Sequence, residues 1–286
     1  MATLTFFHAH PDDEAIATGG TMASLAAQGH RVVLVTATGG ELGEVADGFL
    51  RPGESLGDRR ALELAEAAAV LGVARQVFLG YHDSGMAGEE SNARDDVFAT
   101  AELDEAVSRL AGILAEEASD VLVTYDEHGG YGHPDHVRVH DVGTAAADRA
   151  GTPVVYLTTM DRDFMSALRR EAAESDLGSA DDLEGTDTMG EPAARITTEL
   201  DVTPWLAAKR AAMAAHASQI TEESFFLRMP EDVFARVWGQ EWFIRVRPEP
   251  MGLGDGIRER ALVVTADGVT AGGAPTDGVV DTGVAP

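Results

Sequence analysis

Residues 3–14 of the chain read TLTFFHAHPDDE, and this stretch decides the fold. Its first half, residues 4–8, is a short and mostly apolar run, which predicts a buried strand. Its second half sets one proline beside three acidic residues. This combination favours the first turn of a helix, because proline fits there and carboxylates stabilise the positive end of the helix dipole. We therefore expect a strand that runs directly into a helix.

The same alternation of short apolar runs and longer helical stretches continues to residue 160. Further strands are predicted at residues 31–36, 76–80, 121–125 and 153–158, and helices near residues 15–28, 58–71, 100–117 and 135–150. Elements in this order build βαβ units with right-handed crossovers. The sequence therefore predicts an α/β fold with a Rossmann-like, doubly wound and mostly parallel sheet, helices on both faces, and ligands at the carboxyl ends of the strands.

The second half of the chain is less regular and predicts a smaller C-terminal α/β extension, with strands at residues 195–202 and 241–246 and a helix at 204–219. Residues 171–194 contain eight acidic residues and no basic one, which is typical of a flexible lid or insertion, or of a solvated loop without a role. Residues 251–286 are rich in glycine and predict a loosely held tail that has room for one edge strand. We expect one domain over residues 1–250.

Composition limits the partners and the chemistry. The 286 residues are 44% apolar and 24% charged, which is enough for a full hydrophobic core. Acidic residues outnumber basic ones 49 to 21, and a net charge of −28 disfavours nucleic acid and anionic membrane surfaces. The chain has no cysteine, so any metal must be bound by His, Asp or Glu. It has neither a membrane-spanning apolar run nor a signal-like N-terminus, which predicts a cytoplasmic protein.

One residue of the first motif is not explained by a well-made helix start. The proline and the acids suit the helix, but His10 has no role in it. Its imidazole and the carboxylate of Asp13, three residues further on, can converge on one point and bind a cation.

A second motif, YDEHGGYGHPDH at residues 125–136, again follows a predicted strand directly. Its glycines allow a tight loop, and the helix after Pro134 sets His136 and His140 one turn apart. Such a pair alone is weak evidence, because surface histidines are common at helix starts. Together, however, the two motifs bring His, Asp and His to one crevice at the carboxyl ends of parallel strands. That set predicts a zinc site with three protein ligands and one open position.

The motif pair, AHPDDE at residues 9–14 and GHPDH at residues 132–136, resembles the LmbE/PIG-L family of zinc-dependent N-deacetylases. Four further stretches agree with that family: LGDRRALELAEAAAVLGV from residue 56, DSGM from residue 83, KRAAMAAHASQ from residue 209 and GQEWFIR from residue 239. The resemblance spans about residues 3–247 and leaves the tail uncovered. The sequence is similar to the actinobacterial branch that includes the mycothiol-pathway deacetylase and the mycothiol S-conjugate amidase.

The resemblance implies that His10, Asp13 and His136 bind one zinc ion and that Asp12 is the general base. Asp12 is next to a ligand in the sequence without being one, so it can face water on the metal. Zinc lowers the pKa of that water, and a carboxylate within hydrogen-bonding distance takes the remaining proton.

Three more residues receive catalytic roles by the same resemblance. His133 is expected to protonate the leaving amine or to stabilise the tetrahedral oxyanion. Asp135 is expected to orient an imidazole, which selects its tautomer and raises its pKa. Tyr131, in the glycine loop, is a further candidate for contact with the oxyanion.

Substrate contacts are expected at Arg60, Asp83 and His216. Each has a structural alternative. Arg60 can pair with Glu63 one turn away on the same helix, Asp83 can be a turn residue, and His216 can be a polar residue of the core.

The activity that the resemblance implies is hydrolysis of a linear amide. The protein would remove the N-acetyl group from an N-acetylglucosamine-type sugar or glycoconjugate, by attack of metal-bound water. An alternative is a hydrolase of a larger amide, similar to the mycothiol S-conjugate amidase. A third hypothesis is a metal- or sugar-binding module without catalysis. Against it, the sequence lacks the G-x-G-x-x-G motif that such a fold would place after the first strand. The expected partner is a small molecule, and a homo-oligomer is left open.

Overall fold

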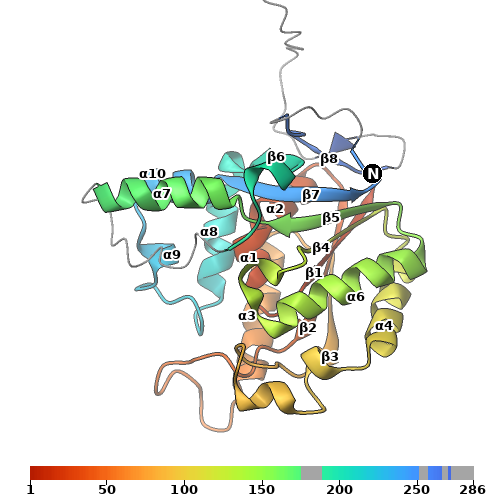
Figure 1. Cartoon of the computed structure of the whole chain (residues 1–286). Helices are drawn as coiled ribbons and strands as arrows, with labels where there is room; N and C mark the ends of the chain where they lie inside the picture. The colour runs from red at the N-terminus through yellow and green to blue at the C-terminus, as the bar shows by residue number, and fades with distance from the viewer. Residues whose placement is uncertain (175–188, 251–256, 266–269, 272–286) are drawn as a thin grey trace, which may run out of the picture.

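The computed structural model describes residues 1–174, 189–250, 257–265 and 270–271 (Figure 1). Its main sheet has seven strands in the order β3-β2-β1-β4-β5-β7-β6. The strands are β1 (Thr3–His8), β2 (Arg31–Thr38), β3 (Arg75–Tyr81), β4 (Val121–Tyr125), β5 (Val154–Thr159), β6 (Thr198–Asp201) and β7 (Gln240–Arg247). Strands β1 to β5 are parallel, whereas β7 is antiparallel to β5 and to β6. The predicted mostly parallel sheet is confirmed.

Helices connect and cover these strands. They are α1 (Asp13–Ala17), α2 (Gly19–Ala27), α3 (Leu56–Val70), α4 (Leu103–Glu116), α5 (Gly129–Gly132), α6 (Pro134–Ala150), α7 (Arg162–Glu174), α8 (Leu206–Ala215), α9 (Phe225–Arg228) and α10 (Glu231–Trp238). Short 3-10 helices occur at η1 (Glu90–Ala93), η2 (Phe98–Thr100), η5 (Ala193–Arg195) and η6 (Thr203–Trp205). No helix within the described residues is long and apolar enough to cross a bilayer.

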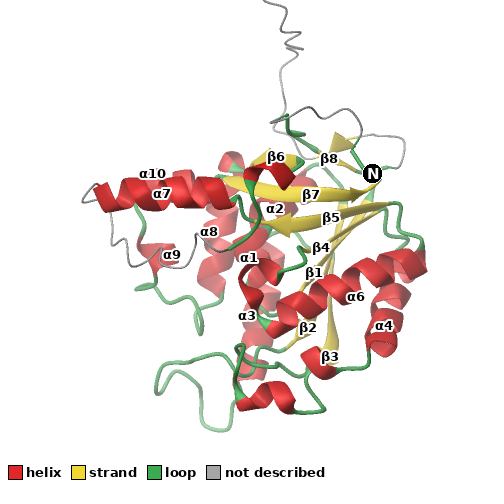
Figure 2. Ribbon diagram, viewed as in Figure 1, coloured by secondary structure: helices red, strands yellow, loops and turns green. Residues whose placement is uncertain are grey.

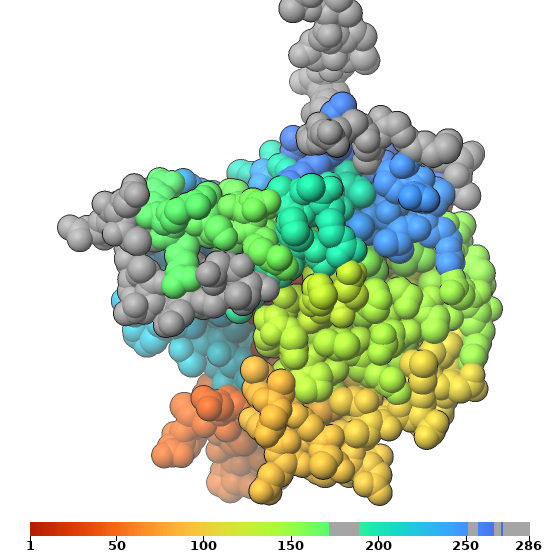
Figure 3. Space-filling model, in the orientation of Figure 1, coloured from red at the N-terminus to blue at the C-terminus, as the bar shows by residue number. Residues whose placement is uncertain are grey.

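Helices lie on both faces of the sheet, as the sequence predicts (Figure 2). Successive side chains of β1 point to opposite faces, because the side-chain period of a strand is two. Phe6 belongs to the buried cluster that contains Leu25 of α2, and Phe7 to the cluster that contains Leu110 of α4. Both phenylalanines are fully buried. Almost nothing of β1 reaches the surface seen in Figure 3, where the red start of the chain is hidden by later segments.

Strand β1 lies at the point where the strand order reverses. The chain proceeds from β1 to β2 and β3 on one side, and then returns to place β4 and β5 on the other. Thr5 pairs with Val33 of β2 and with Leu122 of β4. The carboxyl ends of β1 and β4 are therefore neighbours, and a doubly wound sheet binds its ligands in the crevice at such a reversal.

The predicted strands of the first half all form, with ends shifted by no more than two residues. The helix predicted over residues 15–28, however, is interrupted at Thr18, which has non-helical angles (φ −137°, ψ 9°). The hydroxyl of Thr18 lies 2.9 Å from His8 Nε2. The second half of this helix starts with two glycines, and a Cβ on Gly20 would lie only 2.5 Å from Cβ of Val202. The interruption thus lets α2 pack closely on a distant segment.

The C-terminal half completes the same sheet with β7 and β6. The predicted helix at 204–219 ends earlier, at Ala215, and the sequence patterns did not indicate α7, α9 or α10. Of the predicted lid at residues 171–194, residues 175–188 lie outside the described residues, and residues 171–174 end α7. In the predicted tail, Leu262–Val263 form β8, which pairs with β9 (Thr270–Ala271) and is buried, and most other tail residues lie outside the described part. The domain boundaries stay a prediction.

A buried ion pair connects α8, β7 and α2. Lys209 Nζ lies 2.6 Å from Glu241 Oε1, and both side chains are 1% exposed. The two oxygens of Glu241 also accept hydrogen bonds from the backbone N–H groups of Gly20 and Thr21, each at 2.9 Å. The carboxylate thus accepts hydrogen bonds from the free N–H groups of the first turn of α2 and also balances the charge of the lysine.

We predict that Lys209→Ala lowers the free energy of unfolding by about 3–5 kcal/mol, because it leaves a buried carboxylate without its cation. Urea denaturation checks this value. The matched control is Arg94→Ala, which breaks an exposed ion pair with Asp96 (2.7 Å) and should leave the stability unchanged. Equal stability of the two variants would contradict a structural role for the buried pair.

Candidate metal centre

Three side chains converge at the carboxyl ends of β1 and β4. His10 follows β1, Asp13 begins α1, and His136 lies in the first turn of α6. His10 Nδ1 is 3.3 Å from His136 Nε2, and each of these nitrogens is 3.4 Å from Asp13 Oδ2. Ligands of a tetrahedral zinc ion, each about 2.0–2.1 Å from the metal, are about 3.3–3.4 Å apart. The three donor atoms therefore fit the spacing and the chemistry of a zinc site.

Neighbouring acceptors decide which nitrogen of each imidazole is free to bind a cation. His10 Nε2 lies 3.1 Å from Asp135 Oδ2, and His136 Nδ1 lies 3.2 Å from the carbonyl oxygen of Gly129. Each of these nitrogens carries a proton and donates it to its oxygen. The opposite nitrogens, which form the triangle with Asp13, then have free lone pairs.

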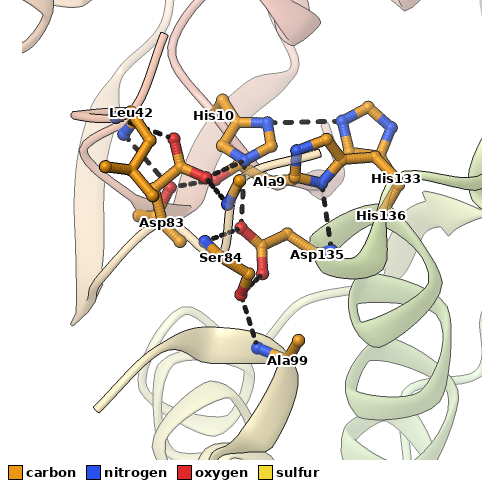
Figure 4. A network of polar contacts seen from close by, with 12 residues as sticks. Ala9, His10, Leu42, Asp83, Ser84, Ala99, His133, Asp135 and His136 are labelled. Atoms are coloured by element: carbon orange, nitrogen blue, oxygen red, sulfur yellow. Dashed lines mark hydrogen bonds and ion pairs between the residues drawn. The ribbon is translucent and has the colours of Figure 1, made fainter. Parts of the chain in front are cut away.

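The sequence predicts that Asp135 orients an imidazole, and in the structure that imidazole is His10 (Figure 4). The carboxylate of Asp135 is itself fixed by Ser84, which donates from its backbone N–H at 3.0 Å and from its hydroxyl. Burial lowers the pKa of His10, but the neighbouring carboxylates of Asp13, Asp135 and Asp83 outweigh this and raise the pKa well above its usual value. The local field thus strongly favours a positive charge at this point.

His133 caps the first turn of α6 and makes no hydrogen bond with the carboxylate of Asp135. Its Nδ1 accepts a hydrogen bond from the backbone N–H of Asp135 (3.1 Å), and His133 is thereby the N-cap of α6. The carboxylate of Asp135 does not orient it. Burial and the imidazoles of His10 and His136 lower the pKa of His133 to about 4. In the neutral ring the proton is therefore on Nε2.

The loop before α6 needs glycine to bring His136 into place. A Cβ on Gly129 (φ 61°) would lie 2.5 Å from Cβ of His136. Tyr131, in the same loop, is 48% exposed, and its hydroxyl lies 3.5 Å from His136 Nε2. The structure thus brings Tyr131 to the edge of the metal centre.

Asp12 has a strained backbone, with φ 109° and ψ −32°, which is an outlier for a residue other than glycine. Its backbone N–H donates to Glu14 Oε2 at 3.0 Å. Glu14 Oε1 in turn lies 2.6 Å from His216 Nε2, and both of these side chains are fully buried. His216 therefore lies behind Asp12 as part of its support, and this contact accounts for its position in the core.

Arg60 supports the same residue from the other side. Its guanidinium lies 3.2 Å from Asp12 Oδ2 and donates to the carbonyl oxygens of Pro11 (2.5 Å) and Gly40 (2.7 Å). Glu63, the alternative partner from sequence, instead accepts hydrogen bonds from Ser218. Burial raises the pKa of Asp12 to about 6, although the charge of Arg60 lowers it.

Asp83 lies beside His10, with 3.6 Å between Asp83 Oδ1 and His10 Nε2. Its carboxylate accepts hydrogen bonds from the backbone N–H groups of Leu42 (3.2 Å) and Gly85 (2.8 Å). Asp83 thus lies against the nitrogen of His10 that faces away from the triangle with Asp13, and its contact with a sugar hydroxyl stays a prediction.

Two residues of the site were missed from sequence. The carboxylate of Glu14 was interpreted only as a favourable charge at a helix start, and nothing marked Ser84 as a partner of Asp135. His8, two residues before His10, has a structural role instead. Its two ring nitrogens lie 2.9 Å from the hydroxyls of Tyr125 and Thr18.

Comparison with known proteins shows the family to which the chain belongs. The family model PIG-L, described as GlcNAc-PI de-N-acetylase, matches residues 5–147. A 1D-myo-inositol 2-acetamido-2-deoxy-alpha-D-glucopyranoside deacetylase from Acidothermus cellulolyticus is 40% identical to this chain, and the match covers 95% of this chain and 98% of the relative. An enzyme of the same name from Streptomyces griseus is 38% identical, covering 96% and 93%.

Solved structures show the same fold. The N,N'-diacetylchitobiose deacetylase from Pyrococcus horikoshii is similar with a TM-score of 0.57 and 20% identity, over 87% of both chains. A zinc-inhibited form of the teicoplanin deacetylase Orf2 is similar with a TM-score of 0.58 and 19% identity, over 85% of this chain and 98% of that one.

We predict that His136→Ala reduces the zinc content from one ion per chain to nearly none, because it removes one of three protein ligands. Elemental analysis after dialysis against zinc and then buffer measures this. The matched control is His140→Ala, one turn further along α6, where the imidazole contacts the carbonyl oxygen of Tyr125 and should not affect zinc. Full zinc content in His136→Ala would show that the metal is bound elsewhere.

Proposed function

The chain belongs to the PIG-L family of de-N-acetylases, and from this membership we propose that it is a zinc-dependent amidohydrolase that removes the acetyl group from N-acetylglucosaminyl inositol. The observation that carries the proposal is the triangle of His10, Asp13 and His136, with Asp12, whose backbone is strained, next to Asp13 in the chain. The relatives with 38–40% identity, named for this substrate, span nearly the whole chain. A neutral glycoside also suits a protein whose net charge is −28.

The reaction joins water to the acyl carbon and breaks the C–N bond of the amide, which gives acetate and a free amine. When bound, zinc would polarise the amide carbonyl and lower the pKa of water toward neutrality. Asp12 would take the proton of the attacking water as a general base. Its backbone and carboxylate are held by Glu14 and Arg60, so the base needs no rearrangement before it acts.

The leaving nitrogen must gain a proton before it departs as an amine, and the proton that Asp12 takes from water would pass to it. His133 would donate a hydrogen bond from Nε2 to the carbonyl oxygen, since its Nδ1 already accepts a hydrogen bond from the backbone. Tyr131 is a second donor at the edge of the site. Three properties stay predictions: one zinc ion per chain, a cytoplasmic location and a possible homo-oligomer.

Mass spectrometry of N-acetylglucosaminyl inositol, incubated with zinc-loaded protein, tests the proposed function. We predict the free amine and acetate as products, a slower reaction with free N-acetylglucosamine, and no reaction after treatment with a chelator. Turnover that is unchanged by the chelator, or no release of acetate from either sugar, would refute the proposal.

We predict that Asp12→Asn keeps its zinc but lowers kcat by about 10²–10⁴, because asparagine cannot accept the proton of water. Zinc content and initial rates, measured on the same preparation, check both parts. A variant with full activity would remove Asp12 from the mechanism.

We predict that His216→Ala lowers kcat by about a hundredfold while the KM and the zinc content change little. His216 acts only as a positioning residue, through Glu14 on the backbone of Asp12, and small displacements of a reacting group have effects of this size. The control is His82→Ala, which removes an exposed imidazole that contacts Glu41. If His216→Ala raises the KM and leaves kcat unchanged, the residue binds substrate instead.

A further inference from the structure

An apolar pocket opens beside the metal centre, and the roles assigned so far do not use it. We call it the side pocket. Asp13 and His136 form its inner end. The surface that its walls expose is mostly apolar and comes from side chains such as Ile16, Met160, Trp238 and Trp242, and the ion-paired Lys209 and Glu241 also line it.

Two polar side chains near the metal ligands, Arg60 and Asp83, do not line the side pocket and come from the other side of the sheet. Arg60 comes from α3, which connects β2 to β3, and Asp83 follows β3. The side pocket, in contrast, lies at the carboxyl end of β5 and the start of β7, where Met160 and Trp242 are found. In the sheet, β2 and β3 are on one side of β1 and β4, and β5 and β7 are on the other. The metal centre therefore separates a polar region from an apolar one.

The two regions match the two halves of an amide substrate. The substituents on the carbonyl carbon and on the nitrogen of an amide point in opposite directions. A sugar has many hydroxyls, and burying them against an apolar wall would leave them without hydrogen-bond partners. The sugar is thus expected on the side of Asp83 and Arg60. The acyl group is expected in the side pocket, where burial of hydrocarbon is favourable.

The side pocket is larger than an acetyl group requires. Its cavity volume is about 130 Å³. A protein cavity of about 150 Å³ lined by apolar side chains binds benzene, whereas a single water takes about 30 Å³. The methyl of an acetyl group would therefore leave most of this space unfilled.

We propose that the side pocket is an acyl subsite that accepts an unbranched apolar acyl group of four to six carbons. The inference rests on the proposed function, because it assigns the acyl half of the same substrate. In this reaction the water oxygen bonds to the acyl carbon and the C–N bond breaks. Butanoate or hexanoate then leaves in place of acetate, and the amine keeps the sugar.

A series of N-acyl glucosamines tests the proposal, with acetyl, butanoyl, hexanoyl and decanoyl groups on the same amine. Zinc-loaded protein should hydrolyse the butanoyl compound with a kcat/KM about tenfold above that of the acetyl compound, because two more methylene groups are buried. The value should fall for the decanoyl group, which exceeds the pocket. If the acetyl compound is hydrolysed best and each longer chain is worse, the acyl subsite is refuted and the deacetylase is not.

Substitution of Met160 tests whether the side pocket is responsible. Met160→Trp fills the space and should lower the ratio of kcat/KM for the butanoyl compound to that for the acetyl compound from about ten to about one or less. Met160→Ala enlarges the space and should move the preference toward longer chains. An unchanged preference in both variants would overturn the assignment.

A binding measurement gives a result that does not depend on turnover. Two of the three tryptophans, Trp238 and Trp242, line the side pocket, so a ligand there should change the tryptophan fluorescence. Hexanoate should bind the zinc-loaded protein at least tenfold more tightly than acetate, and Met160→Trp should remove the difference. Tight binding of hexanoate without hydrolysis of any amide would refute the proposed function and keep the acyl subsite. Equal affinities for hexanoate and acetate would refute the subsite.

Discussion

The parallel pairing of β1 with β4 is the constraint on which the rest of the structure depends. Leu4 pairs with Val121 and Phe6 with Val123, so the two strands end at the same edge of the sheet. Each strand is followed directly by the start of a helix. His10 and His136 are 126 residues apart in the chain, yet this pairing alone brings their imidazoles within 3.3 Å. A shift in register would move one motif away from the other and leave no site with three ligands.

Several acidic side chains lie close together around the carboxyl ends of β1 and β4. Asp12, Asp13, Asp83 and Asp135 all lie near His10, in a crevice that largely excludes water. Such carboxylates repel one another unless cations or N–H donors compensate them. Backbone N–H groups, Arg60 and the imidazoles supply part of that compensation, and a bound metal would supply the rest. The strained backbone of Asp12 persists because Glu14 and Arg60 hold it from two sides.

Sequence patterns predicted the strands and the two motifs of the first half, but they missed contacts between segments that are far apart in the chain. The strands of the first half and the two motifs were found because period, proline and glycine are local signals. The interruption at Thr18 depends on contact with Val202, and the support of Glu14 depends on His216, 202 residues away. The sequence predicted that Asp135 orients an imidazole but could not say that this imidazole is His10, 125 residues away. Such contacts form only when distant segments pack, so no local pattern contains them.

X-ray absorption at the zinc edge tests the central claim most directly, because it reports the atoms around the metal in the holoprotein. The account predicts only nitrogen and oxygen neighbours at about 2.0–2.1 Å, two of them from imidazoles. A spectrum with no imidazole, or with only one, would contradict the account, because the zinc would then not be held by both His10 and His136.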